Sequence, residues 1–316
     1  MTVALLFSPQ GSQRVGMGRE LAQRSPAAAA AFAEADAVLG LSVSDTCWNG
    51  PAERLNDTRQ TQPCLLATSV AALRALEELT APAPVLVAGH SVGEYAALVA
   101  AGVLEFGSAL RLVVRRAELM AGAGGEGGMA AVIGLDRSAV QAVVDDIARP
   151  TELVVANDNA PGQVVISGLR DAIEAAEEPM LVAGARRVLL LPVSGAFHSP
   201  MMAGVAGELA DAFEAETWRD ALVPVVSNVT AEPLTDADRI RALLAEQVRS
   251  PVEWVASVRR LVAAGVDTMI ECGAGAALTG MVRRIAPEVT TATVSDAATL
   301  DEAAALLGAP TPVTAR

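Results

Sequence analysis

The stretch VLVAGHSVGEYAAL, residues 85–98, constrains the fold of this chain more than any other segment. A short apolar run ends at Gly89, and a helical pattern begins at Gly93. The intervening Gly-x-Ser-x-Gly pattern places small residues two positions before and two after Ser91, which allows a strand to turn sharply into a helix. Such a turn predicts a strained backbone at Ser91 and an exposed hydroxyl. The stretch therefore favours an α/β fold with Ser91 as a nucleophile.

Ser91 needs partners, and the sequence offers few. The N–H of Val92 would lie at a helix N-terminus, where it can stabilise an oxyanion. The chain has only two histidines. His90 directly precedes Ser91, and successive side chains in an extended segment point in opposite directions, so we expect His90 to support the turn. His198 is therefore the predicted base. No acidic third member can be chosen from spacing, and a backbone carbonyl could equally orient the His198 ring.

Composition excludes several classes of protein. Hydrophobic residues make up 52% of the 316 residues, yet no run is long enough to cross a bilayer. A net charge of −14 disfavours nucleic acid and anionic membranes as partners. The three cysteines are widely spaced and are expected as reduced thiols, so no metal and no cofactor are predicted. The first residues do not resemble a signal peptide, and we expect a cytoplasmic protein.

The order of apolar and helical patterns divides the chain into two parts. Up to about residue 120, short apolar runs alternate with helical patterns at 17–38 and 61–79, which is typical of a parallel sheet. The glycine-rich stretch AGAGGEGG, residues 121–128, indicates a joint between subdomains.

Beyond that joint, the patterns follow the order strand, helix, strand, strand, helix, strand. Helices are expected at 137–147 and 170–183, and NDNAPG, residues 157–162, is expected as the turn between the middle strands. This order within about 65 residues is that of a ferredoxin-like unit. The alanine-rich tail, residues 301–316, is expected as a final helix and a frayed end.

The predicted fold class is α/β. A hydrolase-like large subdomain, residues 1–126 and 195–316, carries the parallel sheet and the nucleophile elbow. A ferredoxin-like small subdomain, residues 127–194, is inserted into it.

Nine motifs, one of which contains the sharp strand-to-helix turn at Ser91 (the nucleophile elbow), occur in one order along the chain and give a specific resemblance. They are QGSQ (10–13), TQPCLLA (61–67), GHSVGEYAAL (89–98), LVVRRAELM (112–120), GGMAAVIGL (127–135), ANDNAPGQVVISG (156–168), GAFHSPMM (195–202), QVRSPVEW (247–254) and ECGAGAALTGM (271–281). Through them the chain resembles the malonyl-CoA:acyl-carrier-protein transacylases of fatty acid synthesis and the related acyltransferases of polyketide synthesis. The resemblance covers roughly residues 3–290.

The resemblance implies a role for each matched position. Ser91 is the acylated nucleophile and His198 its base, and the oxyanion is bound by Gln10 and the Val92 N–H. Arg116 binds the malonyl carboxylate, Gln62 is a pocket residue, and the backbone carbonyl of Gln247 orients the histidine. The implied partners are malonyl-CoA and an acyl carrier protein.

Physical chemistry supports one of these roles independently. A substrate with a terminal carboxylate needs a bidentate cation in a partly desolvated pocket, which suits Arg116. Taken without the resemblance, a place on a solvated helix face would be the preferred reading for Arg116. The resemblance adds that, in the related polyketide acyltransferases, GAFH goes with malonyl; Phe197 would fill the space that an α-methyl group needs.

Two departures from the family pattern stand out. The opening loop reads FSPQGSQ instead of FPGQGSQ, and Pro9 removes an N–H and fixes φ just before Gln10, so the loop path is expected to differ. Ala274 and Ala276 replace a proline and a lysine, which weakens a possible basic contact to an acidic carrier protein. Other candidates for that contact are Arg186, Arg187, Arg283 and Arg284.

Three functions compete at this point. The first is malonyl transfer, or transfer of a different extender unit, by a discrete acyltransferase. The second is an acyl-thioester hydrolase on the same fold, against which Arg116 argues because simple acyl groups need no carboxylate clamp. The third is a non-catalytic carrier-binding protein, for which the altered loop is the only hint.

Overall fold

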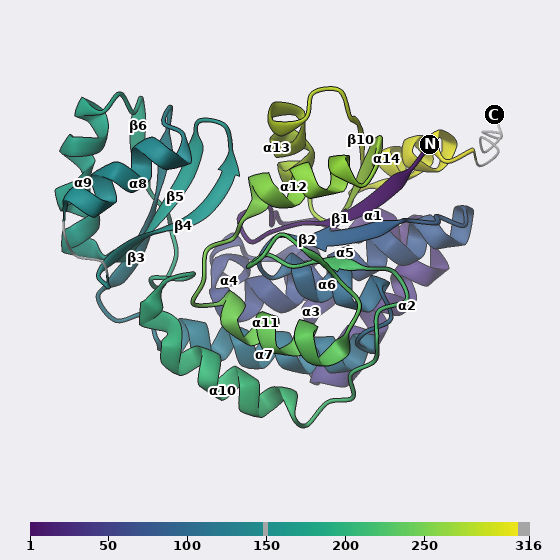
Figure 1. Cartoon of the computed structure of the whole chain (residues 1–316). Coiled ribbons are helices and arrows are strands. Elements are labelled where there is room, and N and C mark those ends of the chain that lie inside the picture. The colour runs from purple at the N-terminus through teal and green to yellow at the C-terminus, as the bar shows by residue number, and fades with distance from the viewer. Residues whose placement is uncertain (148–150, 309–316) are drawn as a thin grey trace.

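A parallel sheet forms the centre of the larger part of the molecule (Figure 1). The computed structural model describes residues 1–147 and 151–308. In it, six strands lie in the order β10-β9-β1-β2-β7-β8, and all neighbours are parallel except β7 and β8. The strands are β1 (Val3–Phe7), β2 (Leu86–Gly89), β7 (Val225–Val226), β8 (Pro233–Leu234), β9 (Thr268–Cys272) and β10 (Thr290–Val294).

Strand β1 shows why both faces of this sheet are covered. All five of its residues are buried. Val3, Leu5 and Phe7 belong to one hydrophobic core, whereas Ala4 and Leu6 belong to another on the opposite face. Uninterrupted apolar strands of this kind are typical of parallel sheets with helices on both sides. The predicted α/β fold with a parallel sheet is confirmed.

Helices pack on both faces of the sheet. The larger layer holds α5 and α7, and α12 and α13 cover the other face (Figure 1). The helices outside the second sheet are α1 (Arg19–Arg24), α2 (Pro26–Leu39), α3 (Val43–Asn49), α4 (Ala52–Asn56), α5 (Thr58–Leu79), α6 (Gly93–Ala100), α7 (Phe106–Gly122), α10 (Ala203–Phe213), α11 (Ala237–Gln247), α12 (Trp254–Ala263), α13 (Ala277–Ile285) and α14 (Ala297–Leu306). None of the helices in the described ranges is long and apolar enough to span a membrane.

A second, antiparallel sheet stands at the left of Figure 1. Its strands lie in the order β4-β5-β3-β6, and two helices pack on one face. The elements are β3 (Gly127–Ile133), α8 (Arg137–Asp146), β4 (Leu153–Ala160), β5 (Gln163–Leu169), α9 (Arg170–Val182) and β6 (Arg187–Leu190). The predicted order of strands and helices is therefore present. On the opposite face, Met129 and Val165 join the main core, so this sheet forms a wall of the larger part.

Backbone hydrogen bonds join the two sheets. The N–H of Val252 donates to the carbonyl of Ala156 at 2.8 Å, and the N–H of Asp158 donates to the carbonyl of Val252 at 3.1 Å. The segment that leads into α12 thus extends the edge of β4 and fixes the second sheet beside the first.

Several predicted boundaries were wrong, for local reasons. The helix expected at 17–38 is two helices, because Ser25 is extended before Pro26 and proline disfavours helical backbone in the preceding residue. The turn expected at 157–162 is only Pro161–Gly162, since β4 continues through two register shifts to Ala160. The last helix, α14, ends at Leu306, and the expected frayed end at 309–316 lies outside the described residues.

The elbow glycines allow a close approach of backbone to backbone. A Cβ placed on Gly93 would lie 2.2 Å from the carbonyl oxygen of Phe7, and one on Gly89 would lie 2.0 Å from the carbonyl carbon of Gly93. Neither neighbour is a flexible side chain, so helix α6 can follow β2 this tightly only with glycine at both positions.

We predict that Gly93→Ala lowers the free energy of unfolding by about 3 kcal/mol or more, because the added methyl group forces the backbone of β1 and α6 apart. The matched control is Gly207→Ala in α10, where a Cβ meets nothing within 4 Å. That change should stabilise the protein by up to about 1 kcal/mol. Urea unfolding measures both, and equal midpoints for Gly93→Ala and the unmodified protein would contradict the argument.

Candidate active site

Ser91 occupies a strained turn between β2 and α6. Its φ is +53°, a conformation that non-glycine residues rarely adopt. Asn228 clamps the turn from a distant loop: its Oδ1 accepts from the Ser91 N–H at 2.7 Å, and its Nδ2 donates to the Gly89 carbonyl at 2.6 Å. Nothing in the local sequence pattern predicts this role for Asn228.

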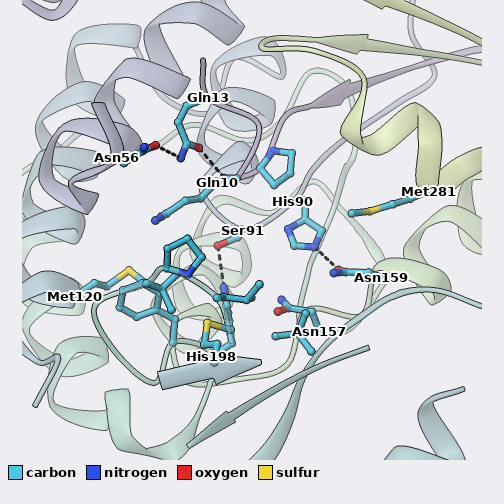
Figure 2. A pocket seen from close by; sticks show the side chains of 18 residues that line it. Gln10, Gln13, Asn56, His90, Ser91, Met120, Asn157, Asn159, His198 and Met281 are labelled. Carbon is cyan, nitrogen blue, oxygen red and sulfur yellow. Dashed lines mark hydrogen bonds between the residues drawn. The ribbon is translucent and has the colours of Figure 1, made fainter. Parts of the chain in front are cut away.

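His198 faces Ser91 directly. The Oγ of Ser91 and the Nε2 of His198 are 2.8 Å apart, as the dashed line in Figure 2 marks. The Nδ1 of His198 lies 2.9 Å from the carbonyl oxygen of Gln247 and 3.3 Å from that of Ser250. A carbonyl can only accept, so Nδ1 carries the proton and Nε2 is left to accept one from Ser91. The structure thus places a backbone carbonyl at the orienting position.

His90 points elsewhere. Its Nε2 lies 2.8 Å from the Oδ1 of Asn159, and its ring packs 5.4 Å from the ring of Trp254. Figure 2 shows the ring turned from Ser91 toward Asn159. This placement agrees with the expectation that His90 supports the turn and does not reach the serine hydroxyl.

Arg116 lies inside the site, not on a solvated face. It is 1% exposed, and its Nη2 donates to the Ser91 Oγ at 3.0 Å. The same nitrogen donates to the Gln247 Oε1 at 3.0 Å, and Nη1 donates to the Gln62 Oε1 at 2.7 Å. The guanidinium also lies over the Tyr95 ring, 5.9 Å from its centre. Burial lowers the pKa of Arg116, although a guanidinium stays protonated in proteins.

A pocket of about 300 Å³ opens in front of Ser91 and His198. Both parts of the molecule line it: Pro9, Gln10 and Phe197 come from loops of the larger part, and Met129 and Val165 come from the second sheet. Figure 2 shows Gln10 and His198 on opposite sides of Ser91. The pocket therefore lies between loops of the larger part and the second sheet, which contributes apolar Met129 and Val165 and polar Asn157 and Asn159.

The loop that carries Gln10 accommodates Pro9. The Pro9 carbonyl accepts from the Ser12 N–H at 3.3 Å and from the Ser12 hydroxyl at 2.7 Å, and Gly11 supplies the positive φ of +99° that this turn needs. The Gln10 amide nitrogen lies 3.4 Å from the Thr58 hydroxyl. Gln10 thus still lines the pocket despite the proline.

Val92 is the N-cap residue of helix α6. The N–H groups of Gly93 and Glu94 donate back to the carbonyls of His90 and Ser91 at 3.0 Å each. The Val92 N–H precedes these bonds at the helix N-terminus, where a partial positive charge favours a developing oxyanion.

Glu94 is a second site residue that was not among the predicted ones. It is 3% exposed in the first turn of an otherwise apolar helix. Burial raises its pKa to about 7, against the opposing effects of hydrogen bonds from Gln247 and Asn228 and of the charge on Arg116. The available signal was the single charge in GEYAAL, since charged side chains are rarely buried without a partner.

Comparison with known proteins agrees with this geometry. The fold and the Ser91–His198 pair place the chain among α/β enzymes with a serine at a strand-to-helix turn. The model of the acyl transferase domain family matches residues 4–304. Malonyl CoA-acyl carrier protein transacylases are 44% identical in Bacillus subtilis (302 residues, 95% of each chain) and 42% identical in Escherichia coli K12 (295 residues, 93% of this chain and 96% of the relative).

Solved structures show the same similarity. An acyl carrier protein S-malonyltransferase from Vibrio cholerae superposes with a TM-score of 0.93 at 41% identity, covering 96% of this chain and all of the other. A malonyl-transacylase in complex with a type II polyketide synthase acyl-carrier protein superposes with a TM-score of 0.94 at 40% identity, covering 97% of this chain and all of the other. The chain belongs to the acyl transferase domain family, among the malonyl CoA-acyl carrier protein transacylases, and it is an acyltransferase.

We predict that neither histidine titrates near its ordinary pKa of about 6.5. Burial, reinforced by the charge of Arg116, lowers the pKa of His198 to about 3, and burial lowers that of His90 to about 4. The unfolded chain therefore binds more protons below pH 6.5, and the free energy of unfolding falls as the pH drops through that value.

The chain has only two imidazole rings, so NMR can follow both ring C–H signals directly against pH. We expect constant shifts from pH 8 down to about 5 in the folded protein. A signal with a midpoint near pH 6.5 would show that a ring is solvated or paired with a carboxylate.

Proposed function

We propose that this acyltransferase moves a malonyl group from malonyl-CoA to the phosphopantetheine thiol of an acyl carrier protein. The observation that carries the proposal is the buried guanidinium of Arg116, 3.0 Å from the Oγ of Ser91. An acyl group on Ser91 with a terminal carboxylate can meet that cation inside the site. The names of the curated relatives support the same substrate and acceptor.

The first half-reaction would acylate Ser91. As the Oγ attacks the thioester carbonyl, its proton passes to the Nε2 of His198, which lies 2.8 Å away. The Val92 N–H and Gln10 would stabilise the oxyanion. When the C–S bond breaks, CoA leaves as the thiol with the proton from His198, and malonyl-Ser91 remains.

The second half-reaction reverses these roles. His198 takes the proton of the phosphopantetheine thiol, the thiolate sulfur attacks the ester carbonyl, and the bond to the Ser91 Oγ breaks. The proton then returns from His198 to Ser91. Gln247 would keep the ring in the required tautomer through its backbone carbonyl, 2.9 Å from Nδ1.

Arg116 would select acyl groups with a carboxylate. Its two terminal nitrogens form a fork suited to a bidentate carboxylate, and Gln62 holds one of them at 2.7 Å. An acetyl group would leave this buried cation without an anion, which is unfavourable. Phe197, 4% exposed and on the pocket wall, would limit space for an α-branch and thus disfavour other extender units.

Hydrolysis of acyl thioesters remains the alternative, and it is not favoured. A hydrolase for simple acyl groups gains nothing from a buried guanidinium beside the nucleophile.

The carrier would dock beside α13. Arg284 donates to the Gln163 side chain at 2.7 Å and also to the Pro161 carbonyl, so it bridges α13 and the β4–β5 turn. Arg186 packs near the same turn, against Gly134. Met281 of α13 lines the pocket, so a basic surface there would bring an acidic carrier to the entrance.

The division into subdomains stays part of this proposal. The strand order β4-β5-β3-β6 and the separate core under α8 and α9 support a ferredoxin-like unit at 127–194. The sharp β2–α6 turn supports a hydrolase-like large subdomain of residues 1–126 and 195–316. The cytoplasmic location also stays a prediction.

We predict that incubation with malonyl-CoA adds the mass of one malonyl group to the protein, and that Ser91→Ala abolishes this adduct, because it removes the hydroxyl oxygen that lies 2.8 Å from His198. Intact-protein mass spectrometry measures both. The control is Ser194→Ala, an exposed residue next to the pocket residue Val193, which should acylate as the unmodified protein does. An adduct that survives Ser91→Ala would refute the mechanism.

We predict that Arg116→Ala lowers the malonyl-to-acetyl ratio of kcat/KM about 100-fold, because a charge-assisted pair with the substrate is lost. The ratio for Arg116→Lys should fall between those of Arg116→Ala and the unmodified enzyme, since lysine keeps the charge but lacks the two-nitrogen fork of arginine.

The matched control is the neighbouring Arg115→Ala. Arg115 is half-exposed and pairs with Glu208 at 2.7 Å, so the ratio should stay unchanged. Equal ratios for Arg116→Ala and the unmodified enzyme would exclude Arg116 as the carboxylate site.

A further inference from the structure

Glu94 is a buried carboxylate that the two half-reactions do not use. It lies three positions after Ser91. Its Oε2 accepts from the Gln247 side-chain nitrogen at 2.6 Å and from the Asn228 N–H at 3.3 Å. Within the part of the chain that the structure describes, no ion pair joins it to Arg116, and a neutral carboxamide lies between the two charges.

That carboxamide belongs to Gln247, the last residue of α11, which is fully buried. Its nitrogen donates to Glu94 and, at 3.0 Å, to the Ser91 carbonyl. Its oxygen accepts from Arg116 at 3.0 Å. The backbone carbonyl of the same residue accepts from His198. One glutamine therefore contacts the nucleophile's backbone, the histidine and the arginine.

The direction of this carboxamide matters. Arg116 offers only donors, so it requires the amide oxygen, and a carboxylate offers only acceptors, so it requires the amide nitrogen. A flipped amide would set two donors against each other at Arg116 and two acceptors against each other at Glu94. Both faulty contacts would be buried, where unmatched polar groups are most unfavourable.

We propose that Glu94 is a positioning residue, whose carboxylate fixes the direction of the Gln247 carboxamide. It thereby holds Arg116 and His198 within hydrogen-bond distance of Ser91. The effect on substrate selection rests on the function proposed above. The effect on the free protein does not, because the Glu94–Gln247–Arg116 chain exists without substrate.

The direct test is Glu94→Gln, which keeps the shape and removes the charge and the requirement for a donor. We expect a loss of about tenfold or more in kcat/KM for malonyl-CoA, with a lower malonyl-to-acetyl ratio, since Arg116 is no longer held. In the free protein, the His198 ring N–H signal should broaden in NMR spectra, because Gln247 moves.

A double-mutant cycle tests whether Glu94 acts on Arg116 through the Gln247 carboxamide. If Glu94 acts through the carboxamide, Gln247→Leu should reproduce the lower ratio, and Glu94→Gln in that background should add nothing. Multiplicative effects of the two changes would overturn the proposal. If Glu94→Gln does not fold, a Gln247→Leu variant that folds and keeps the wild-type malonyl-to-acetyl ratio would also overturn it.

The control is Glu216→Gln, which removes a mostly buried carboxylate paired with Arg111 at 2.7 Å, away from the site. It should leave the ratio and the His198 signal unchanged. A folded Glu94→Gln protein with an unchanged His198 signal and ratio would overturn the proposal. If the unmodified enzyme transfers no malonyl group while Glu94→Gln still broadens the signal, the proposed function fails and the positioning role stands.

Discussion

The buried guanidinium of Arg116 is the constraint around which the site is organised. A permanent cation removed from water requires hydrogen-bond acceptors and nearby negative charge. Gln62 and Gln247 supply the acceptors, and Glu94 supplies the charge through Gln247. Because Ser91 is also among the acceptors, the cation and the nucleophile are held together before any substrate arrives.

The backbone geometry of the large sheet makes this arrangement possible. Gly89 and Gly93 let α6 leave β2 so tightly that Ser91 projects at the sheet edge, and Asn228 holds the strained turn from another loop. His198 also has a positive φ, +58°, and its N–H is anchored to the Val248 carbonyl at 2.9 Å. Two strained residues thus face each other, each fixed by a segment far away in the sequence.

Local patterns in the sequence were enough to predict part of the fold and of the site. The elbow at Ser91, the parallel sheet and the order of elements at 127–194 follow from small residues, apolar runs and periodicity. His198 could be selected because the chain has only one other histidine. Asn228 and the burial of Arg116 could not be predicted this way, because they depend on which distant loops meet at the carboxyl end of β2, and Glu94 was marked only as the single charge in GEYAAL. The break between two helices at Ser25 and the strand through Asn157 were predicted wrongly because local features outweighed the general pattern. These features were a single proline after Ser25 and two register shifts in the strand.

The pocket wall and the reacting groups are built from different parts of the chain. Met129 and Val165 of the second sheet form the wall, whereas Ser91 and His198 are both fastened to the large sheet and its loops. A mutation at Met129 or Val165 can therefore reshape the space for the acyl chain without removing a hydrogen bond of Ser91 or His198. Substrate range and catalytic chemistry are separable in this architecture, so the wall can be redesigned while the Ser91–His198 pair is left intact.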